Sequence, residues 1–155
     1  MAKQVIEAHA HSAAPREAVW QVIADVPAWS RWGAWRSSEL VHEGGPPPGG
    51  LGAVKVLTSE NRRPVVSTEE VTVFEPPSRF SYKLLSGMPL RDYNATITLT
   101  GAGDGGTHIT WRSQFEPKYP LTGGLFRRAL GRFIKDAAQR LAREAERASG
   151  PPEPA

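Results

Sequence analysis

The sequence predicts an α+β fold in which a strongly curved antiparallel sheet of seven strands wraps around one long C-terminal helix. Apolar residues recur at spacings of three and four over residues 121–148, which is the pattern of one helix face. Upstream of this helix, apolar and polar residues alternate in short segments that end at turns rich in Gly and Pro. Because short turns join these segments, consecutive strands must be antiparallel neighbours, and a curved sheet around the helix is the economical arrangement.

The first part of the chain predicts one strand and two short helices. Residues 4–11 alternate loosely between apolar and polar side chains and predict the first strand. A short helix opens at Pro15, and Pro27 ends it because proline disrupts a helix interior. Residues 28–32 then predict a second short helical turn.

Six further strands follow, each bounded by turn residues. They are predicted over residues 37–43, 51–57, 65–74, 79–85, 91–100 and 107–116. Residues 44–50, which read GGPPPGG, are a loop tip because this composition suits neither a strand nor a helix. The glycine-rich residues 101–106 form a hairpin connection.

The long helix is predicted from Leu121, just after Pro120, to Ala148, just before Gly150. At 1.5 Å per residue it spans roughly 40 Å. Its apolar face consists of five residues: Phe126, Leu130, Phe133, Ala137 and Leu141. This face carries large side chains near its start and small ones further on. A face with such steps, laid on a curved sheet, can enclose a cavity as easily as a solid core.

The length of 155 residues and the ordinary composition favour one ligand-binding domain over residues 1–148, followed by a disordered Pro-rich tail over residues 149–155. The chain has no cysteine, which excludes disulfides, a thiolate nucleophile and a cysteine metal site. We find no apolar run that would form a signal peptide or a membrane span. We therefore expect a cytoplasmic protein without stable membrane insertion, as a monomer or weak homodimer.

The positive charge is concentrated on the predicted helix. Residues 127–147 hold seven Lys or Arg and three Asp or Glu, an excess of +4 within a net charge of +3, so the rest of the chain is near −1. The simplest interpretation is a solvated helix face with ion pairs. Because exposed aromatic residues do not alternate with the basic ones, we expect no nucleic-acid partner.

Several motifs resemble one known superfamily along nearly the whole chain. Residues 14–20 (APREAVW), with Asp25 and the tryptophans after it, resemble the opening of the START-like (SRPBCC) superfamily. Residues 69–77 (EEVTVFEPP), 90–93 (LRDY) and 109–111 (ITW) are similar to its polyketide cyclase/dehydrase branch. The resemblance implies the helix-grip fold of birch-pollen-allergen-like proteins, with a hydrophobic cavity between the sheet and the long helix. The superfamily includes lipid carriers, hormone receptors and cyclases, so the resemblance specifies fold more closely than activity.

The alternation of side chains along a strand identifies the residues expected to line such a cavity. Candidate ligand-binding residues are those on the apolar strand faces, on the helix face and in the tryptophan cluster at 29–35: Trp35, Val71, Tyr82, Leu84, Arg91, Tyr93, Ile97, Trp111, Phe115, Phe126, Leu130 and Phe133. Most of these residue types equally suit plain packing, and the tryptophan cluster suits either a gate at the cavity mouth or a cover for the sheet edge.

Two charged residues alternate in step with this apolar set, so they belong to the same strand faces. Arg91 alternates with Tyr93, and Glu69 alternates with Val71, so both are predicted to point to the concave side. A buried charge is costly unless it is paired or hydrated. Two interpretations stay open: a salt bridge between Arg91 and Glu69 at the rim, or the polar end of an apolar pocket that holds a carbonyl or a phenol.

Three histidines are predicted on the opposite, convex face. His9 and His11 lie on the first strand and His108 on the last strand, which should pair with it in this fold. A cross-strand imidazole cluster is therefore possible, but no carboxylate or cysteine completes a zinc set, and we expect no metal and no cofactor.

Three functions fit these observations. The first is a carrier, sequestering or biosynthetic accessory protein that binds a hydrophobic, polycyclic aromatic or polyketide-like molecule. The second is a polyketide cyclase for aldol cyclisation and dehydration, in which Arg91 and Tyr93 polarise a carbonyl and Glu69 acts as the base. That enzyme requires all three side chains to converge on one point. The third is a surface-acting regulator that uses the basic helix in a salt-dependent way.

Overall fold

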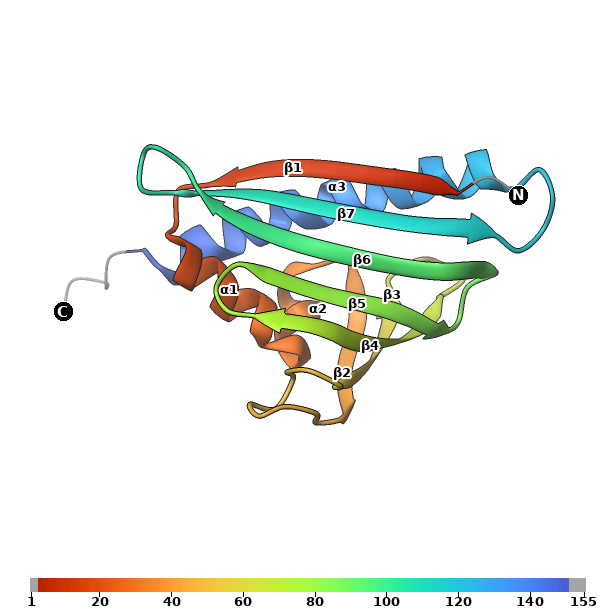
Figure 1. Ribbon diagram of the computed structural model, residues 1–155, viewed down its shortest axis with the longest axis horizontal. Helices are drawn as coiled ribbons and strands as arrows, with labels where there is room; N and C mark the ends of the chain where they lie inside the picture. The colour runs from red at the N-terminus through yellow and green to blue at the C-terminus, as the bar shows by residue number, and fades with distance from the viewer. Residues whose placement is uncertain (1–2, 151–155) are drawn as a thin grey trace.

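A computed structural model describes residues 3–150, and the tail residues 151–155 lie outside the described part. Figure 1 shows a sheet of long strands with the C-terminal helix running along it. The strands are β1 (Gln4–Ser12), β2 (Trp35–His42), β3 (Val54–Ser59), β4 (Val66–Glu75), β5 (Arg79–Ser86), β6 (Leu90–Gly101) and β7 (Thr107–Pro117). The helices are α1 (Arg16–Ala24), the 3-10 turn η1 (Val26–Ala28), α2 (Trp29–Trp32) and α3 (Gly123–Ala148).

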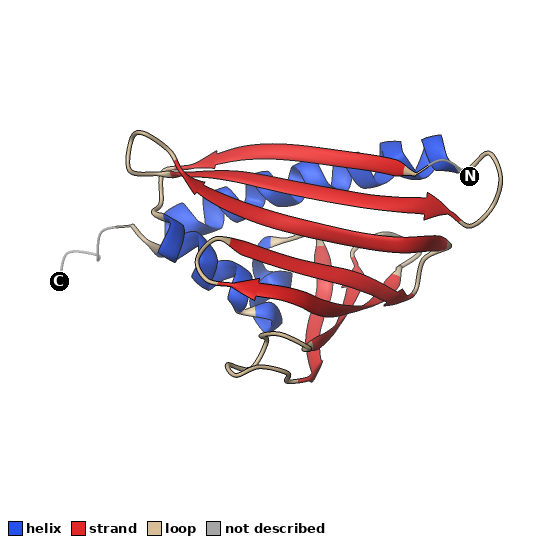
Figure 2. Cartoon of the chain, in the orientation of Figure 1, coloured by secondary structure: helices blue, strands red, loops and turns tan. Residues whose placement is uncertain are grey.

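The seven strands form one antiparallel sheet in the order β1-β7-β6-β5-β4-β3-β2. Consecutive strands from β2 to β7 are neighbours, as their short connections require, and β1 closes the order beside β7. In Figure 2 the strands β2 and β3 turn steeply away from the direction of β1 and β7, which gives the sheet its concave side. The predicted seven-stranded sheet with a long C-terminal helix and two short helices is confirmed.

Helix α3 packs mainly against β1, and also against α1 and β7. Its second half carries the small residues that allow this close approach: Ala137, Ala138, Ala142 and Ala145 are all buried. Its first half is different, because Phe126, Leu130 and Phe133 are only partly buried. The stepped face therefore packs as solid core at one end of the sheet and stands away from it at the other.

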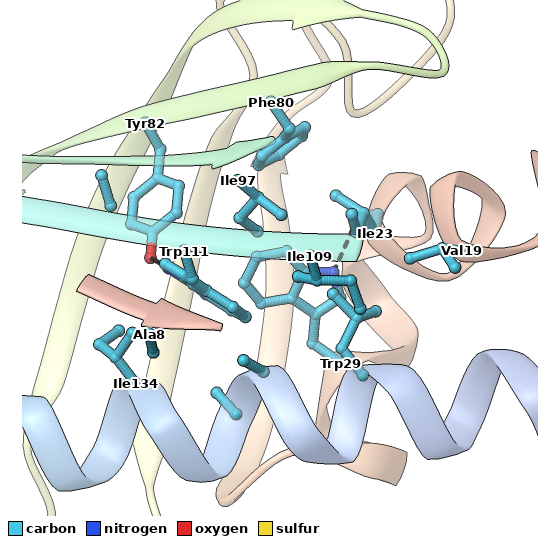
Figure 3. Packing of buried hydrophobic residues seen from close by; sticks show 14 of the residues in the cluster. Ala8, Val19, Ile23, Trp29, Phe80, Tyr82, Ile97, Ile109, Trp111 and Ile134 are labelled. Carbon is cyan, nitrogen blue, oxygen red and sulfur yellow. Dashed lines mark hydrogen bonds between the residues drawn. The ribbon is translucent and has the colours of Figure 1, made fainter. Parts of the chain in front are cut away.

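A cluster of aromatic rings fills the core at the packed end of the sheet. Trp29 is fully buried and donates its indole N–H to the carbonyl of Ile23 at 2.9 Å. Its ring lies between 5.2 and 6.5 Å from five other aromatic rings, among them Trp111 and Phe80. Figure 3 shows Trp29, Trp111 and Ile109 between the sheet and α3. The short helices α1 and α2 thus cover this end of the concave face and fill it with core residues.

Several element boundaries differ from the sequence prediction by one to three residues, and two of these shifts have a clear cause. Helix α3 begins at Gly123 rather than Leu121, because Leu121 has a left-handed backbone with φ of 65° and is exposed to solvent. Strand β3 begins at Val54 rather than residue 51, because Gly52 sits in a turn with φ of 82°. Neither shift changes which face of the element is apolar.

The outer face of α3 carries ion pairs within the helix, as the simplest interpretation of its charge predicts. Arg140 lies 2.8 Å from Asp136, and Arg147 pairs with Glu144. Such exposed pairs contribute little to stability. Within residues 3–150, no helix is both long and apolar enough to cross a membrane.

Candidate ligand-binding cavity

A cavity of about 270 Å³ lies between the first half of α3 and the concave face of strands β3 to β6. Seven of the residues named from the sequence line it: Trp35, Glu69, Tyr82, Tyr93, Phe126, Leu130 and Phe133. The ring of Phe133 meets that of Trp35 edge-on at 5.5 Å, and the pair joins the helix to β2 across the cavity. The walls are mostly apolar, and the volume is close to the lower end for small-molecule sites.

Four predicted wall residues belong to the solid core instead. Val71, Ile97, Trp111 and Phe115 are at most 1% exposed and do not line the cavity. Their parity was predicted correctly, since all of them face inward. Parity fixes the face of a strand but not the position along it, and Trp29 covers the far part of that face. Leu84 is half-buried and packs against the core without lining the cavity.

The prediction for Arg91 is wrong, because a β-bulge interrupts the alternation that it relied on. Arg91 lies opposite Glu116 and Asn94 lies opposite Gln114, so three steps along β6 match two steps along β7. Asp92 takes up the difference with a left-handed φ of 51°. Arg91 consequently shares the outer face of the sheet with Glu116, is exposed, and takes no part in the cavity.

The partner of Glu69 is Lys55, which was not among the predicted site residues. The two residues lie directly opposite each other on β3 and β4, with Lys55 Nζ 3.4 Å from Glu69 Oε1. The side chain of Lys55 is 0% exposed and that of Glu69 is 6% exposed. The signal was present in the sequence, since Lys55 alternates with Leu57, an apolar residue of the cavity wall.

Aromatic rings complete the surroundings of the Lys55 ammonium. Its Nζ lies 3.7 Å from the ring centre of Trp29 and 3.9 Å from that of Tyr82. Attraction between a desolvated cation and an aromatic face is worth about 2 kcal/mol. Burial still dominates, and it lowers the pKa of Lys55 to about 8 against the opposing effect of the Glu69 carboxylate. Burial likewise raises the pKa of Glu69, which the Lys55 ammonium opposes.

The Glu69 carboxylate is short of hydrogen-bond donors. Oε1 is buried without a well-formed hydrogen bond, and the Lys55 Nζ that faces it is in the same condition. Apart from Lys55, no donor among residues 3–150 reaches either carboxylate oxygen. Glu69 is one of the residues that line the cavity, so its side chain borders any molecule inside.

Two tyrosine hydroxyls lie near this pair and already have partners. Trp111 donates its indole N–H to the Tyr82 hydroxyl at 3.2 Å, and Figure 3 shows the two side chains pointing toward each other. The Tyr93 hydroxyl hydrogen-bonds with Ser113 at 3.3 Å. Burial raises the pKa of Tyr82 and of Tyr93, and the nearby Glu69 charge adds to the effect in each. Both phenols are therefore neutral and protonated at ordinary pH.

The rest of the wall was not named among the predicted site residues, and it comes from loops, from β3 and β4, and from α3. The residues concerned are Leu57, Ser59, Asn61, Val65, Ser67, Gly87, Met88, Pro89, Ala129 and Ile134. Ser59 is occupied by a hydrogen bond from the Val65 amide at 2.8 Å. The loop 87–89 closes the end of the cavity beside Tyr93, and its position depends on tertiary packing that alternation does not encode.

The three tryptophans that the sequence left open lie in three different surroundings. Trp29 is core, and Trp35 forms part of the cavity wall. Trp32 lines a different hollow of about 300 Å³ between α1, α2 and the end of α3. That hollow lies outside the space between sheet and helix and carries charged groups from Arg31, Glu144 and Arg147 at its wall. We therefore place the candidate site in the first cavity.

The histidines do form a cross-strand cluster on the outer face. His9 Nδ1 lies 3.1 Å from His108 Nε2 and the rings stack, while His11 Nε2 lies 3.0 Å from Asp104 Oδ2. Among residues 3–150 no group of three or more His, Asp or Glu side chains has the arrangement of a metal site.

A curved antiparallel sheet that grips a long C-terminal helix, with an apolar cavity between them, defines the helix-grip class of START-like proteins. The family described as polyketide cyclase/dehydrase and lipid transport matches residues 3–146. The chain belongs to this family.

Solved structures agree with this assignment at the level of the fold. A START superfamily protein from Mycobacterium smegmatis superimposes with a TM-score of 0.80 at 15% identity, covering 94% of this chain and 99% of that one. The Zhui aromatase/cyclase from Streptomyces sp. R1128 gives 0.78 at 19% identity, covering 97% and 100%. The protein Ara h 8.0201 gives 0.72 at 19% identity, covering 93% and 98%. No curated protein matches the chain.

Proposed function

We propose that the protein binds a hydrophobic, polycyclic aromatic or polyketide-like small molecule in the cavity between the sheet and α3, as a carrier, sequestering or biosynthetic accessory protein. The observation that carries this proposal is the cavity itself, whose walls come from Trp35, Phe133 and other apolar side chains. A solid core would have been more stable, because each unfilled volume forfeits packing contacts. Flat aromatic ligands suit walls that present aromatic rings.

The family and the fold support either a binding protein or a cyclase, and the cavity supplies part of what a cyclase needs. Glu69 and Tyr93 both line it, which supports a base and a polarising hydroxyl. The third group expected from the sequence, Arg91, is on the outer face of the sheet. Binding therefore has the stronger support, and cyclisation with dehydration of a polyketide chain is the second candidate.

Native mass spectrometry of freshly purified protein, together with titration of 2-methoxynaphthalene, tests the proposal. The fluorescence of Trp35 in the cavity wall provides the signal for the titration. Ala129→Trp places a large side chain at the cavity wall, and Gln139→Trp places the same side chain at an exposed position of α3 away from it. We expect the first variant to weaken binding and the second to bind as the wild type does. No co-purified molecule, and no probe binding, would overturn the proposal.

A further inference from the structure

The Glu69 carboxylate in the cavity wall has one charged partner, Lys55, and no well-formed hydrogen bond within the described chain. Glu69 is 5% exposed, its Oε1 forms no well-formed hydrogen bond, and only the Lys55 ammonium at 3.4 Å faces it. A buried carboxylate normally accepts several hydrogen bonds, because leaving its oxygens without donors is costly. The missing donor is therefore expected from whatever enters the cavity.

We propose that Glu69 accepts a hydrogen bond from a hydroxyl group of the ligand, so that the cavity selects neutral phenols over aromatic molecules without a donor. This inference rests on the proposed function and adds the chemical class of the ligand. An ionised carboxylate can only accept hydrogen bonds, so the ligand must donate. A hydrogen bond to a charged acceptor is worth about 1.5–3 kcal/mol, more than a neutral one.

The other polar groups near the cavity are uncharged, and three of them already have a hydrogen-bond partner. The Tyr82 hydroxyl accepts from Trp111, and the Tyr93 hydroxyl is bonded to Ser113. The Ser59 hydroxyl accepts from a backbone amide. Ser67 and Asn61 line the cavity with uncharged groups, which bind donors and acceptors alike and give no preference between them.

The charge of the site favours a neutral donor over a cationic or anionic ligand. Lys55 and Glu69 together form a neutral pair that is closed off from solvent. An ammonium ligand would add a second positive charge beside Lys55, and a carboxylate ligand would add a second negative charge beside Glu69. Either addition leaves one buried charge uncompensated, which is costly at this depth. A phenol adds a donor without adding charge.

The test compares three aromatic probes, of which 2-naphthol lies between the other two in size. Naphthalene is smaller than 2-naphthol, and 2-methoxynaphthalene is larger but has no donor. At neutral pH we expect 2-naphthol to bind wild-type protein about ten-fold or more tightly than either of the others, the factor for a charged hydrogen bond. Its fluorescence and that of Trp35 follow the titration.

Two variants show that the preference comes from this pair. In Lys55→Met/Glu69→Leu, which keeps the site neutral, we expect 2-naphthol and 2-methoxynaphthalene to bind within about three-fold of each other. Glu69→Gln retains an amide oxygen as an acceptor, so it should keep part of the preference. Thermal melts establish that each variant is folded. The comparison of probes on the wild-type protein tests the proposal even if a variant does not fold.

Each outcome decides the matter. Equal affinity of wild-type protein for 2-naphthol and 2-methoxynaphthalene overturns the selection of phenols while leaving the binding function in place. A fourth probe, 2-naphthylmethylamine, carries a positive charge. If it binds more tightly than 2-naphthol, the selection of phenols is overturned in favour of a cationic ligand. Failure of all probes to bind overturns the proposed function and this inference with it. A preference that survives in the double variant would show that a residue other than Glu69 makes the contact.

Discussion

Lys55 and Glu69 face each other across neighbouring strands, with 3.4 Å between Nζ and Oε1 and almost no exposure to solvent. This pair takes the place of the Arg91–Glu69 salt bridge, which was one of the two interpretations of the sequence. A buried pair of opposite charges gains Coulomb energy but loses the hydration of both ions, and the loss is often the larger of the two. The presence of this pair is therefore weak evidence for a stabilising role.

We expect Lys55→Met to destabilise the protein more than Lys55→Met/Glu69→Leu does. The single variant leaves a buried carboxylate without its counter-ion, and breaking such a pair costs roughly 3–5 kcal/mol. The double variant removes both charges, and apolar replacement of a buried pair is often neutral or stabilising. Urea denaturation of the three proteins measures the unfolding free energies.

The contradicting result is a double variant that loses as much stability as the sum of the two single variants. Such additivity would mean that Lys55 and Glu69 contribute independently, contrary to their contact. Glu69→Leu alone completes the cycle, and the same measurements supply the coupling energy.

The lowered pKa of Lys55 also predicts a pH dependence of stability. Its folded pKa of about 8 is below the pKa of 10.5 of a free lysine side chain. Between these values the unfolded chain binds more protons, so the unfolding free energy rises with pH in this window. Glu69 has the opposite sign, because its raised folded pKa makes stability fall as pH rises from 4.5 through the folded value.

Subtracting the unfolding free energy of Lys55→Met/Glu69→Leu from that of the wild-type protein at each pH isolates the contribution of the Lys55–Glu69 pair. Tyr82 and Tyr93 face the pair, and their raised pKa values lower stability as pH passes about 10, but both tyrosines are present in each protein. From pH 8 to pH 9.5 we expect the wild-type protein to gain about 1–2 kcal/mol relative to Lys55→Met/Glu69→Leu. A flat or falling difference would contradict a Lys55 that is charged only below this window.

Tyr93 and Arg91 show where alternation along a strand predicts the face of a side chain correctly and where it fails. Both were assigned to the concave face by a period of two, and the assignment holds for Tyr93, where the strand is regular. It fails for Arg91, because the bulge at Asp92 adds one residue and reverses the face. The local sequence marks that bulge only weakly: Asp tolerates a left-handed backbone better than most residues, but Asp92 is not a glycine and the strand continues on both sides.

The architecture was predictable because periodicity and turn residues act locally, whereas the cavity depends on how distant elements meet. The apolar face of α3 was identified, but the sequence did not show that Ala137 packs against solid core while Phe133 borders a cavity. Lys55 was not among the predicted site residues, and a lysine on an inward face conflicts with ordinary burial preferences. Such a conflict between local pattern and residue type is often found at a functional site.

Arg91→Met tests the corrected position of this residue. Since Arg91 is exposed on the outer face, the substitution should leave the affinity for 2-naphthol within error and change stability by no more than about 0.5 kcal/mol. Fluorescence titration and thermal melts measure the two quantities. A loss of affinity of ten-fold or more would return Arg91 to the site and strengthen the cyclase interpretation.

Phe133→Ala and Phe115→Ala remove the same atoms from two different surroundings and so test whether the cavity exists in solution. Phe115 is 0% exposed within the solid core, and we expect its truncation to cost roughly 3–5 kcal/mol, the usual range for a buried phenylalanine. Phe133 borders the cavity and is only partly buried, so it already lacks packing partners on one side. Its truncation should cost clearly less, although it forfeits the edge-on contact with Trp35 at 5.5 Å, worth about 0.5–1.5 kcal/mol. Equal losses for the two variants in urea denaturation would mean that Phe133 is ordinary core and that the space beside it is filled.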